Sequence, residues 1–251
     1  MNNLQLENLL NQKLNINIIK DYAPNGLQIE GKSEIKKIIT GVTACQALLD
    51  YAVEEKADAI LVHHGYFWKN EDPRLRGMKG KRIKTLIQND INLYAYHLPL
   101  DIHSELGNNV LFAQAIGLTN LQPMENSPVS IPLWGEFNPP ISAQELTQRL
   151  EKCLQRTPMV SHDNAPNLIH TLGICTGGAQ DYIDLAANLN LDGYITGEVS
   201  ERTIHSAREQ GLHFFSAGHH ATERFGVRAL GKWLQETTGI EVIFKDINNP
   251  A

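Results

Sequence analysis

The sequence has few cysteines and no long apolar run. Its three cysteines, Cys45, Cys153 and Cys175, are far apart and form no C-x-x-C motif. This argues against a disulfide framework and against a thiolate zinc site. No stretch approaches the roughly 18 apolar residues of a membrane span, and the N-terminus lacks the basic and apolar segments of a signal peptide. We therefore expect a cytoplasmic protein without membrane association.

A net basic charge is also missing. The chain has 22 Lys and Arg residues against 28 Asp and Glu residues, a net charge of -6 at pH 7. General nucleic-acid binders are usually basic, so a nucleic-acid partner is disfavoured. The one basic run, residues 69–84, is expected to be a solvated loop and helix start. The alternative is a phosphate contact by its Arg and Lys residues between 74 and 84.

The usual nucleophile and phosphate motifs give no support for covalent or P-loop chemistry. The chain has no G-x-S-x-G motif and no cysteine in a recognisable nucleophile motif. Residues 26–33, GLQIEGKS, match the P-loop pattern, but they alternate like a strand and continue into a second strand. A true P-loop opens a helix whose N–H groups hold phosphate, so this match is rejected.

Apolar, β-branched segments alternate with segments of helical spacing along most of the chain. This alternation predicts an α/β fold with mainly parallel central sheets. The expected strands cover residues 36–42, 57–64, 91–97, 168–175, 193–196, 212–217 and 241–244. The expected helices cover residues 4–13, 45–56, 79–89, 106–118, 142–155, 179–189, 200–210 and 220–237.

Prolines cluster between residues 120 and 140, and this composition shift predicts a boundary. We expect a first α/β part over residues 1–122 and a second or inserted part over 123–190. Residues 191–251 then return to complete the site.

The sequence also contains a weak internal repeat. Residues 38–64 resemble residues 170–198, which places His63 and His64 opposite Gly197 and Glu198. Two interlinked copies could be related by a pseudo-twofold axis with a metal site between them. The alternative is that any two βαβ units look alike at this level.

Imidazole and carboxylate side chains gather where three of the expected strands end. In open parallel sheets, ligands bind outside the carboxyl ends of the strands. Imidazoles and carboxylates together are common ligands of Zn, Fe, Mn and Ni. We therefore predict a metal site formed by His63, His64, Asp101, His219 and Glu223.

Five ligands, two of them carboxylates, are too many for one tetrahedral ion and suit two ions about 3.5–4 Å apart. His219 and Glu223 would share a face of a helix that begins near residue 219. Gly65 would end a strand and let His63 and His64 turn into one cavity. The remaining candidates are expected to be structural or surface residues: His103, His162, His170, His205 and His213.

Four segments, NGLQIEG, LVHHGYFW, YAYHLPLD and GHHATERFGVRAL, resemble the GTP cyclohydrolase I type 2 family of YbgI-like dinuclear metal proteins. The resemblance runs in order and spacing over essentially the whole chain. It implies the same five ligands and two divalent cations per subunit, with Zn, Fe, Mn, Ni and Mg not distinguished. It also implies a toroidal homohexamer with metal sites facing an inner cavity.

Two functions are compatible with these features. The first is a metal-dependent hydrolase, GTP cyclohydrolase-like, that acts on a nucleotide or cyclic amide through metal-activated water. His97 and His220 would then hold the ligands in place or transfer protons. The alternative is a non-catalytic metal-binding assembly that acts through protein or nucleic-acid partners. Five ligands for two ions leave coordination positions open, which favours the hydrolase.

Overall fold

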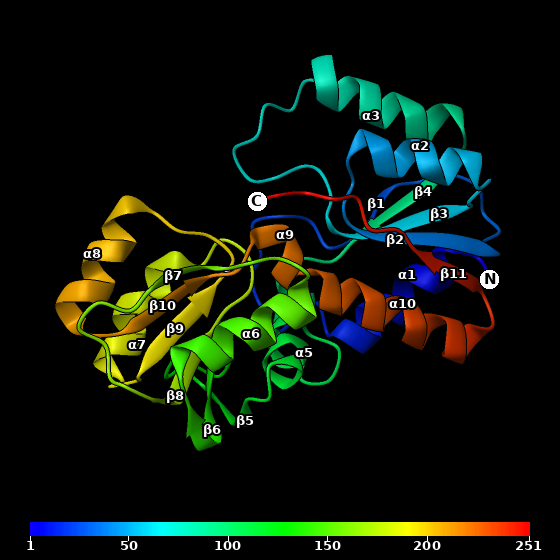
Figure 1. Ribbon diagram of the computed structural model, residues 1–251. Helices are drawn as coiled ribbons and strands as arrows, with labels where there is room; N and C mark the ends of the chain where they lie inside the picture. Colours follow the sequence, from blue (N-terminus) through cyan, green and yellow to red (C-terminus); the bar gives the residue numbers. More distant parts are fainter. The chain divides into compact units, whose positions relative to one another are not determined.

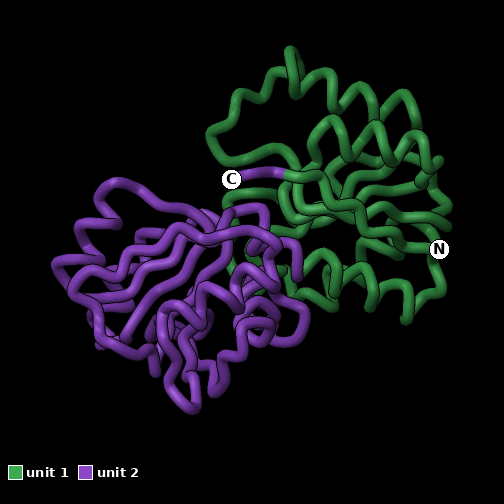
Figure 2. The backbone as a smooth tube through the Cα atoms, in the orientation of Figure 1, with its two compact units in different colours: residues 1–100, 226–248 green, residues 101–225, 249–251 purple.

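The computed structural model describes residues 1–251, which group into two compact units (Figure 2). Unit 1 contains residues 1–100 and 226–248, and unit 2 contains residues 101–225 and 249–251. The chain therefore leaves unit 1 after residue 100 and re-enters it at residue 226. The proline-rich stretch around residues 120–140 lies within unit 2. No helix combines the length and the apolar character that crossing a membrane requires.

Unit 1 is built on a five-stranded sheet in the order β1-β4-β3-β2-β11. Strands β2, β3, β4 and β11 are parallel, and β1 runs antiparallel to β4 at the edge. The strands are β1 (Gly26–Ile29), β2 (Lys37–Thr43), β3 (Ala59–His64), β4 (Asn92–Ala95) and β11 (Glu241–Phe244). The helices are α1 (Asn3–Leu14), α2 (Gln46–Glu54), α3 (Gly77–Gln88) and α10 (Arg224–Thr238).

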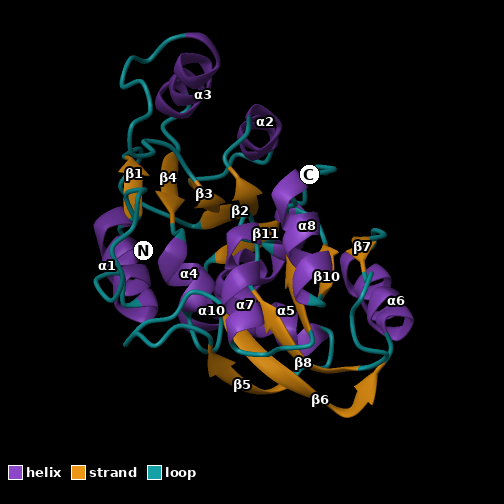
Figure 3. Cartoon of the chain, turned by 90° about the vertical axis from the view of Figure 1, so that its left-hand side faces the viewer, coloured by secondary structure: helices purple, strands orange, loops and turns teal.

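Helices cover both faces of this sheet (Figures 1 and 3). Helices α2 and α3 pack on one face, where Ile39, Ile60 and Leu93 join their apolar side chains in one core cluster. Helices α1 and α10 cover the other face (Figure 1). Burial on both faces explains why β2 and β3 read as continuous apolar runs rather than as alternating ones.

Unit 2 is built on a six-stranded sheet in the order β5-β6-β8-β9-β10-β7. Its central strands β8, β9 and β10 are parallel, and the flanking strands are antiparallel. The strands are β5 (Thr119–Pro123), β6 (Leu133–Ile141), β7 (Met159–Ser161), β8 (Ile169–Ile174), β9 (Gly193–Thr196) and β10 (His213–Ser216). The helices are α5 (Asn108–Ala115), α6 (Ala143–Leu154), η1 (Gln180–Tyr182), α7 (Ile183–Asn188), α8 (Glu201–Gln210) and α9 (His219–Thr222), and α4 (Leu98–Ile102) crosses from unit 1 into unit 2.

The central strands of unit 2 are buried on both faces. Ile195 and Phe215 belong to a core cluster with residues of α5 and α6. Their strand neighbours Tyr194 and Phe214 point the other way, into a cluster with residues of α7 and α8. This alternation is the period-two pattern of a β-strand and makes a three-layer α/β arrangement. The predicted α/β class is therefore confirmed for both units.

The internal repeat is visible in the topology and in matching hydrogen bonds. Unit 1 contains β2-α2-β3-α3-β4, and unit 2 contains β8-α7-β9-α8-β10. Asp58 Oδ2 accepts the backbone N–H groups of residues 36 and 37 at 2.7 and 2.9 Å. Asp192 Oδ2 accepts those of residues 170 and 171, both at 2.8 Å. These positions are related by the same offset that places His63 and His64 opposite Gly197 and Glu198, so the two copies share more than generic βαβ geometry.

The proline-rich segment and the last long helix differ from the sequence-based expectation. The proline-rich segment contains a regular strand, β6, whose pairing with β8 is irregular between Glu136 and Ile141, where Pro139 and Pro140 lie. Proline lacks the N–H needed for a ladder and is tolerated at such irregularities. The helix expected over residues 220–237 is divided into α9 and α10, because Glu223 leaves helical geometry with φ -101° and ψ 7°.

Candidate metal centre

The first two predicted ligands lie at the carboxyl end of β3 in unit 1. His63 is fully buried, and its Nδ1 lies 2.9 Å from the carbonyl oxygen of Tyr96. His64 Nδ1 lies 3.2 Å from Thr43 Oγ1. The two rings are neighbours, with centroids 4.5 Å apart. As the sequence predicts, Gly65 ends the strand, because β3 stops at His64.

Gly65 also allows the chain to pass close to the Gln28 side chain. Gln28 Oε1 accepts the N–H of Tyr66 at 2.7 Å, and its Nε2 donates to the carbonyls of Tyr66 and Pro24 at 3.1 and 2.8 Å. A Cβ on residue 65 would collide with Gln28 Oε1 and would lie 2.6 Å from the Ala95 Cβ. Glycine is therefore required because the chain passes close to Gln28, which fixes the turn after the two histidines.

His97 is held at the end of β4 by residues that precede β1. Its backbone N–H donates to Asn25 Oδ1 at 2.8 Å, and its Nδ1 donates to Asp21 Oδ1 at 2.9 Å. Burial would raise the pKa of Asp21, but the hydrogen bond and charge of His97, with other hydrogen bonds, outweigh it and lower the pKa to about 2. The ligand atoms of His63, His64 and His97 all lie within 4.8 Å of one another, so unit 1 brings three imidazoles together.

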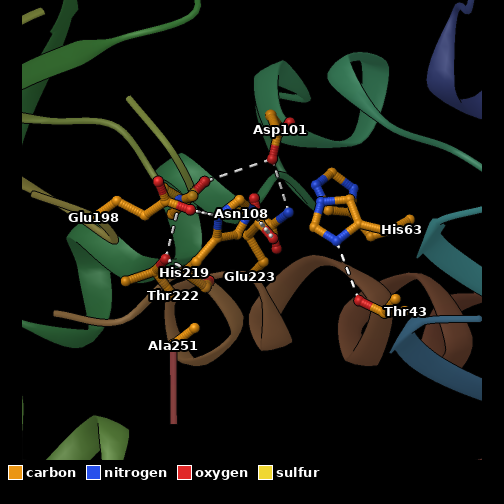
Figure 4. Close-up of polar contacts among 12 residues, drawn as sticks. Thr43, His63, Asp101, Asn108, Glu198, His219, Thr222, Glu223 and Ala251 are labelled. Carbon is orange, nitrogen blue, oxygen red and sulfur yellow. Dashed lines mark hydrogen bonds and ion pairs between the residues drawn. The ribbon is translucent and has the colours of Figure 1, made fainter. Parts of the chain in front are cut away.

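Asp101, in α4, is the first residue of unit 2. Its carboxylate is almost fully buried and accepts a 2.8 Å hydrogen bond from Asn108 Nδ2 (Figure 4). The Thr176 hydroxyl lies 3.5 Å from the same oxygen. One oxygen of the carboxylate is thus positioned by buried donors of its own unit. This favours a fixed carboxylate orientation, as a metal ligand requires.

His219 and Glu223 come from the single turn of α9 and the residue after it. Their spacing of four places His219 Nε2 3.2 Å from Glu223 Oε2, and His219 Nδ1 lies 2.6 Å from Glu198 Oε1 (Figure 4). Burial would lower the pKa of His219, but the hydrogen bonds and charges of Glu223 and Glu198 raise it to about 9. The imidazole therefore lies between two carboxylates, an environment that also favours a divalent cation.

Close backbone packing surrounds the Glu223 carboxylate. Gly177 has φ +72°, and a Cβ there would collide with Glu223 Oε1 and lie 3.2 Å from His219 Nε2. Its N–H donates to Thr222 Oγ1 at 3.0 Å. The glycine after β8 is therefore explained by close approach to the α9 turn. Nothing in its surroundings suggests a dinucleotide site.

The remaining histidines show no comparable clustering. His103 Nδ1 accepts backbone N–H groups of residues 105 and 106 at 3.0 and 3.1 Å, and His213 Nε2 donates to the carbonyl of Pro166 at 2.7 Å. His220 is buried, and its backbone N–H donates to the carbonyl of Ala251 at 3.3 Å. Three others are exposed: His162, His170 and His205.

Two acidic residues of the basic run after β3, Glu71 and Asp72, pair with part of its positive charge. Arg74 Nε lies 2.8 Å from Asp72 Oδ1, and Lys79 Nζ lies 2.9 Å from Glu71 Oε2. These pairs fit the expected solvated loop and helix start, and they leave less free positive charge for a phosphate than the sequence count suggests.

The residues that hold the histidines and Asp101 in place have weak signals in the sequence or none. For Glu198 a signal was present, because the internal repeat places it opposite His64. For Asn25 and Gln28 the signal was their position in the NGLQIEG segment. Asp21 and Asn108 had none, because their contacts join residues distant in the sequence or buried in a helix end.

Comparisons with known proteins show the family to which the chain belongs. A sequence profile of the DUF34/NIF3 (NGG1p interacting factor 3) family matches residues 1–250. Relatives from Haemophilus influenzae and Escherichia coli K12, each called GTP cyclohydrolase 1 type 2 homolog, are 64% and 57% identical, with both chains covered completely. A solved structure of protein ybgI, of unknown function, is 56% identical with a TM-score of 0.96, and both chains are fully covered. The solved structure of TTHA1606 from Thermus thermophilus is 34% identical with a TM-score of 0.89, also over both complete chains.

Proposed function

The chain belongs to the DUF34/NIF3 family, and we propose that it binds two divalent cations and uses them to hydrolyse a small-molecule substrate. The proposed ligands are His63, His64, Asp101, His219 and Glu223. The ligand set draws on both units, since the chain leaves unit 1 immediately before Asp101 and re-enters it three residues after Glu223. Binding of both ions is therefore expected to require the complete folded chain.

The observation that carries this proposal is how the ligand side chains are held. His63 Nδ1 is bound by a backbone carbonyl, and His219 Nδ1 by the Glu198 carboxylate at 2.6 Å. One oxygen of Asp101 is bound by a buried amide at 2.8 Å. Metal-binding histidines typically donate their other N–H to a carbonyl or carboxylate, which fixes the ring and raises its basicity. The same arrangement, repeated over two units, supports metal binding better than a chance gathering of polar residues.

Divalent cations at these residues would supply Lewis acidity, which polarises a substrate oxygen and makes a water molecule more acidic. The chain itself positions the reactants. Asp101 and Glu223 are the two carboxylate ligands of the proposed set, and each has two oxygens for coordination. Glu198 keeps the His219 ring in the orientation and tautomer that exposes Nε2 toward Glu223. The absence of a nucleophile motif makes direct attack by water the expected route.

The proposed substrates are compounds with a hydrolysable carbon–nitrogen bond in a ring, namely a purine nucleotide or a cyclic amide. The purine option is supported by the name of the curated relatives, GTP cyclohydrolase 1 type 2 homolog. The proposed assembly is a homohexamer, for which a native mass of six chains in light scattering is the expected result.

Metal content tests the ligand assignment. The purified protein loaded with Zn²⁺ or Mn²⁺ should hold two ions per chain in elemental analysis, and Glu223→Ala should lose at least one. Glu201→Ala is the matched control, because the Glu201 side chain is 93% exposed and lies outside the proposed site. Two ions retained in Glu223→Ala would overturn the ligand assignment.

Turnover tests the hydrolase assignment separately. The metal-loaded protein should hydrolyse at least one member of a panel of purine nucleotides, phosphoesters and cyclic amides. Full metal occupancy without turnover on any class would instead support the non-catalytic metal-binding assembly.

A further inference from the structure

We propose that Tyr22 and Trp68 form a stacking surface in unit 1 that binds the planar aromatic ring of the substrate. The inference rests on the proposed function and narrows its substrate class, because a purine has a flat π face whereas a saturated cyclic amide has none. It also gives a use to Trp68 of the LVHHGYFW segment, which metal binding alone leaves unexplained.

Both rings lie beside the histidines of unit 1. The Trp68 centroid is 5.8 Å from that of the proposed ligand His64 and 5.0 Å from that of His97. Tyr22 meets His97 edge to face, with centroids 4.9 Å apart. A substrate ring stacked on this pair would therefore lie next to a proposed metal ligand, as hydrolysis at the ring requires.

Tyr22 and Trp68 are more exposed than packing in a core would leave them. Tyr22 is 51% exposed, and Trp68 is half-buried. The core cluster around β3 includes the nearby Tyr66 but neither of these two residues. Ligand sites are lined mainly by apolar and aromatic side chains. Two adjacent accessible rings beside a polar centre therefore favour a surface that a ligand covers.

The spacing of the two rings determines how a substrate ring can bind. Their centroids are 5.9 Å apart, and their planes differ by 36°. A ring inserted between them needs two stacking distances of about 3.5 Å each, roughly 7 Å in all. The pair is therefore too close to form a slot. We expect the substrate ring on its solvent-exposed side, where half of Tyr22 is accessible.

Backbone hydrogen bonds hold the two aromatic residues in place. The Asp21 carboxylate accepts the N–H of Tyr22 at 2.6 Å, and the carbonyl of Tyr22 accepts the N–H of Lys69 at 2.8 Å. The N–H of Trp68 donates to Glu71 Oε2 at 3.3 Å. A surface that is fixed before binding loses little conformational freedom when a ligand binds, which favours affinity.

The backbone conformation of Phe67 independently indicates a functional segment. Its φ is +65°, in the left-handed region that a bulky residue rarely adopts. Such conformations cost energy and gather at active sites and ligand-binding segments. Phe67 directly precedes Trp68, so the strained residue lies in the segment that places Trp68 beside His64.

Binding of GTP and of inorganic tripolyphosphate to the metal-loaded protein tests this inference, because only GTP carries the aromatic ring. Tyr22→Leu and Trp68→Leu should each raise the dissociation constant of GTP by about 5–150-fold, the typical loss of one base–aromatic stack. The dissociation constant of tripolyphosphate should change by less than about twofold. Tyr22→Phe and Trp68→Phe, which keep an aromatic ring, should retain most of the GTP affinity. Trp233→Leu is the matched control, because this half-buried tryptophan pairs with Lys13 instead.

Tyr22→Leu keeps the test decisive if Trp68→Leu folds poorly, because half of the Tyr22 side chain is exposed. Unchanged GTP affinity in the folded leucine variants would overturn the stacking surface and leave the metal proposal intact. An equal loss of GTP and tripolyphosphate affinity, or a metal-loaded wild type that binds no GTP, would overturn it as well. A wild-type chain that binds no metal would instead overturn the proposed function itself.

Discussion

Asn108 gives a sharp test of how the protein prepares Asp101 for metal. Asn108 is fully buried and donates a 2.8 Å hydrogen bond to the Asp101 carboxylate, which is itself only 6% exposed. Asn108→Ala removes this donor, so the buried carboxylate oxygen loses its 2.8 Å hydrogen bond. A hydrogen bond to a charged group contributes about 1.5–3 kcal/mol. Because this one is buried, we expect a loss of about 2 kcal/mol.

The predicted effect appears in metal affinity as well as in stability. About 2 kcal/mol corresponds to roughly a 30-fold larger dissociation constant for the metal, since each 1.4 kcal/mol changes this constant tenfold. This lies within the range of about 10–100-fold for loss of a residue that supports a ligand. Calorimetric titration of the metal-free variant with Zn²⁺ measures the affinity, and urea unfolding of the metal-free protein measures the stability.

Asn92 is the matched control for this variant. It is equally buried, and its Nδ2 donates to the carbonyls of Lys32 and Asp58 at 2.8 and 3.1 Å, with no hydrogen bond to a proposed ligand. Asn92→Ala should therefore lower stability while its Zn²⁺ affinity stays within about twofold of wild type, a difference of roughly 0.4 kcal/mol. Equal losses of affinity in both variants would refute a specific role of Asn108, because the effect would then follow general destabilisation.

Three further outcomes follow from the structure. Gly177→Ala should lower the bound-metal stoichiometry in elemental analysis, because its Cβ would displace the Glu223 carboxylate; full occupancy would show that the carboxylate can move. Asp58→Ala and Asp192→Ala should each lower the urea-derived free energy of unfolding by about 2 kcal/mol, because each loses two backbone hydrogen bonds to a carboxylate; an effect in only one would count against the repeat. Burial lowers the pKa of His213 below 6.5 despite its bond to a carbonyl, so the unfolded chain binds more protons and stability should fall as pH drops below 6.5. His213→Gln should flatten that part of the profile, and an unchanged pH slope would show that His213 does not contribute to it.

Most of the fold could be predicted because its main elements have strong local signals. Strands such as β3 and β9 are apolar runs bounded by turns, and helices such as α6 repeat leucines at helical spacing. The short edge strands lacked such signals. β7 has three residues, and β6 contains two prolines that read as a break in the chain. These segments become strands because they pair with neighbouring strands, and the local sequence pattern does not reveal this pairing.

The proposed ligands could be named from the sequence because they lie at or just after the carboxyl ends of recognisable parallel strands. These strands belong to two different sheets, β3 and β4 to one and β10 to the other. The supporting residues could not be, since they act through contacts that span long stretches of chain. Asp21 is 76 residues from His97, and Gln28 is 38 residues from Tyr66. Neither contact produces a periodic pattern. The break between α9 and α10 at Glu223 has no signal in the sequence, because the apolar residues of this segment keep continuous helical spacing.

Anomalous diffraction from crystals of the Zn²⁺-loaded protein tests the central claim most directly. We predict two anomalous peaks per chain, with His63, His64, Asp101, His219 and Glu223 all within coordination distance of one or both. A single peak, or two peaks that these five side chains do not contact, would contradict the assignment of a dinuclear metal centre.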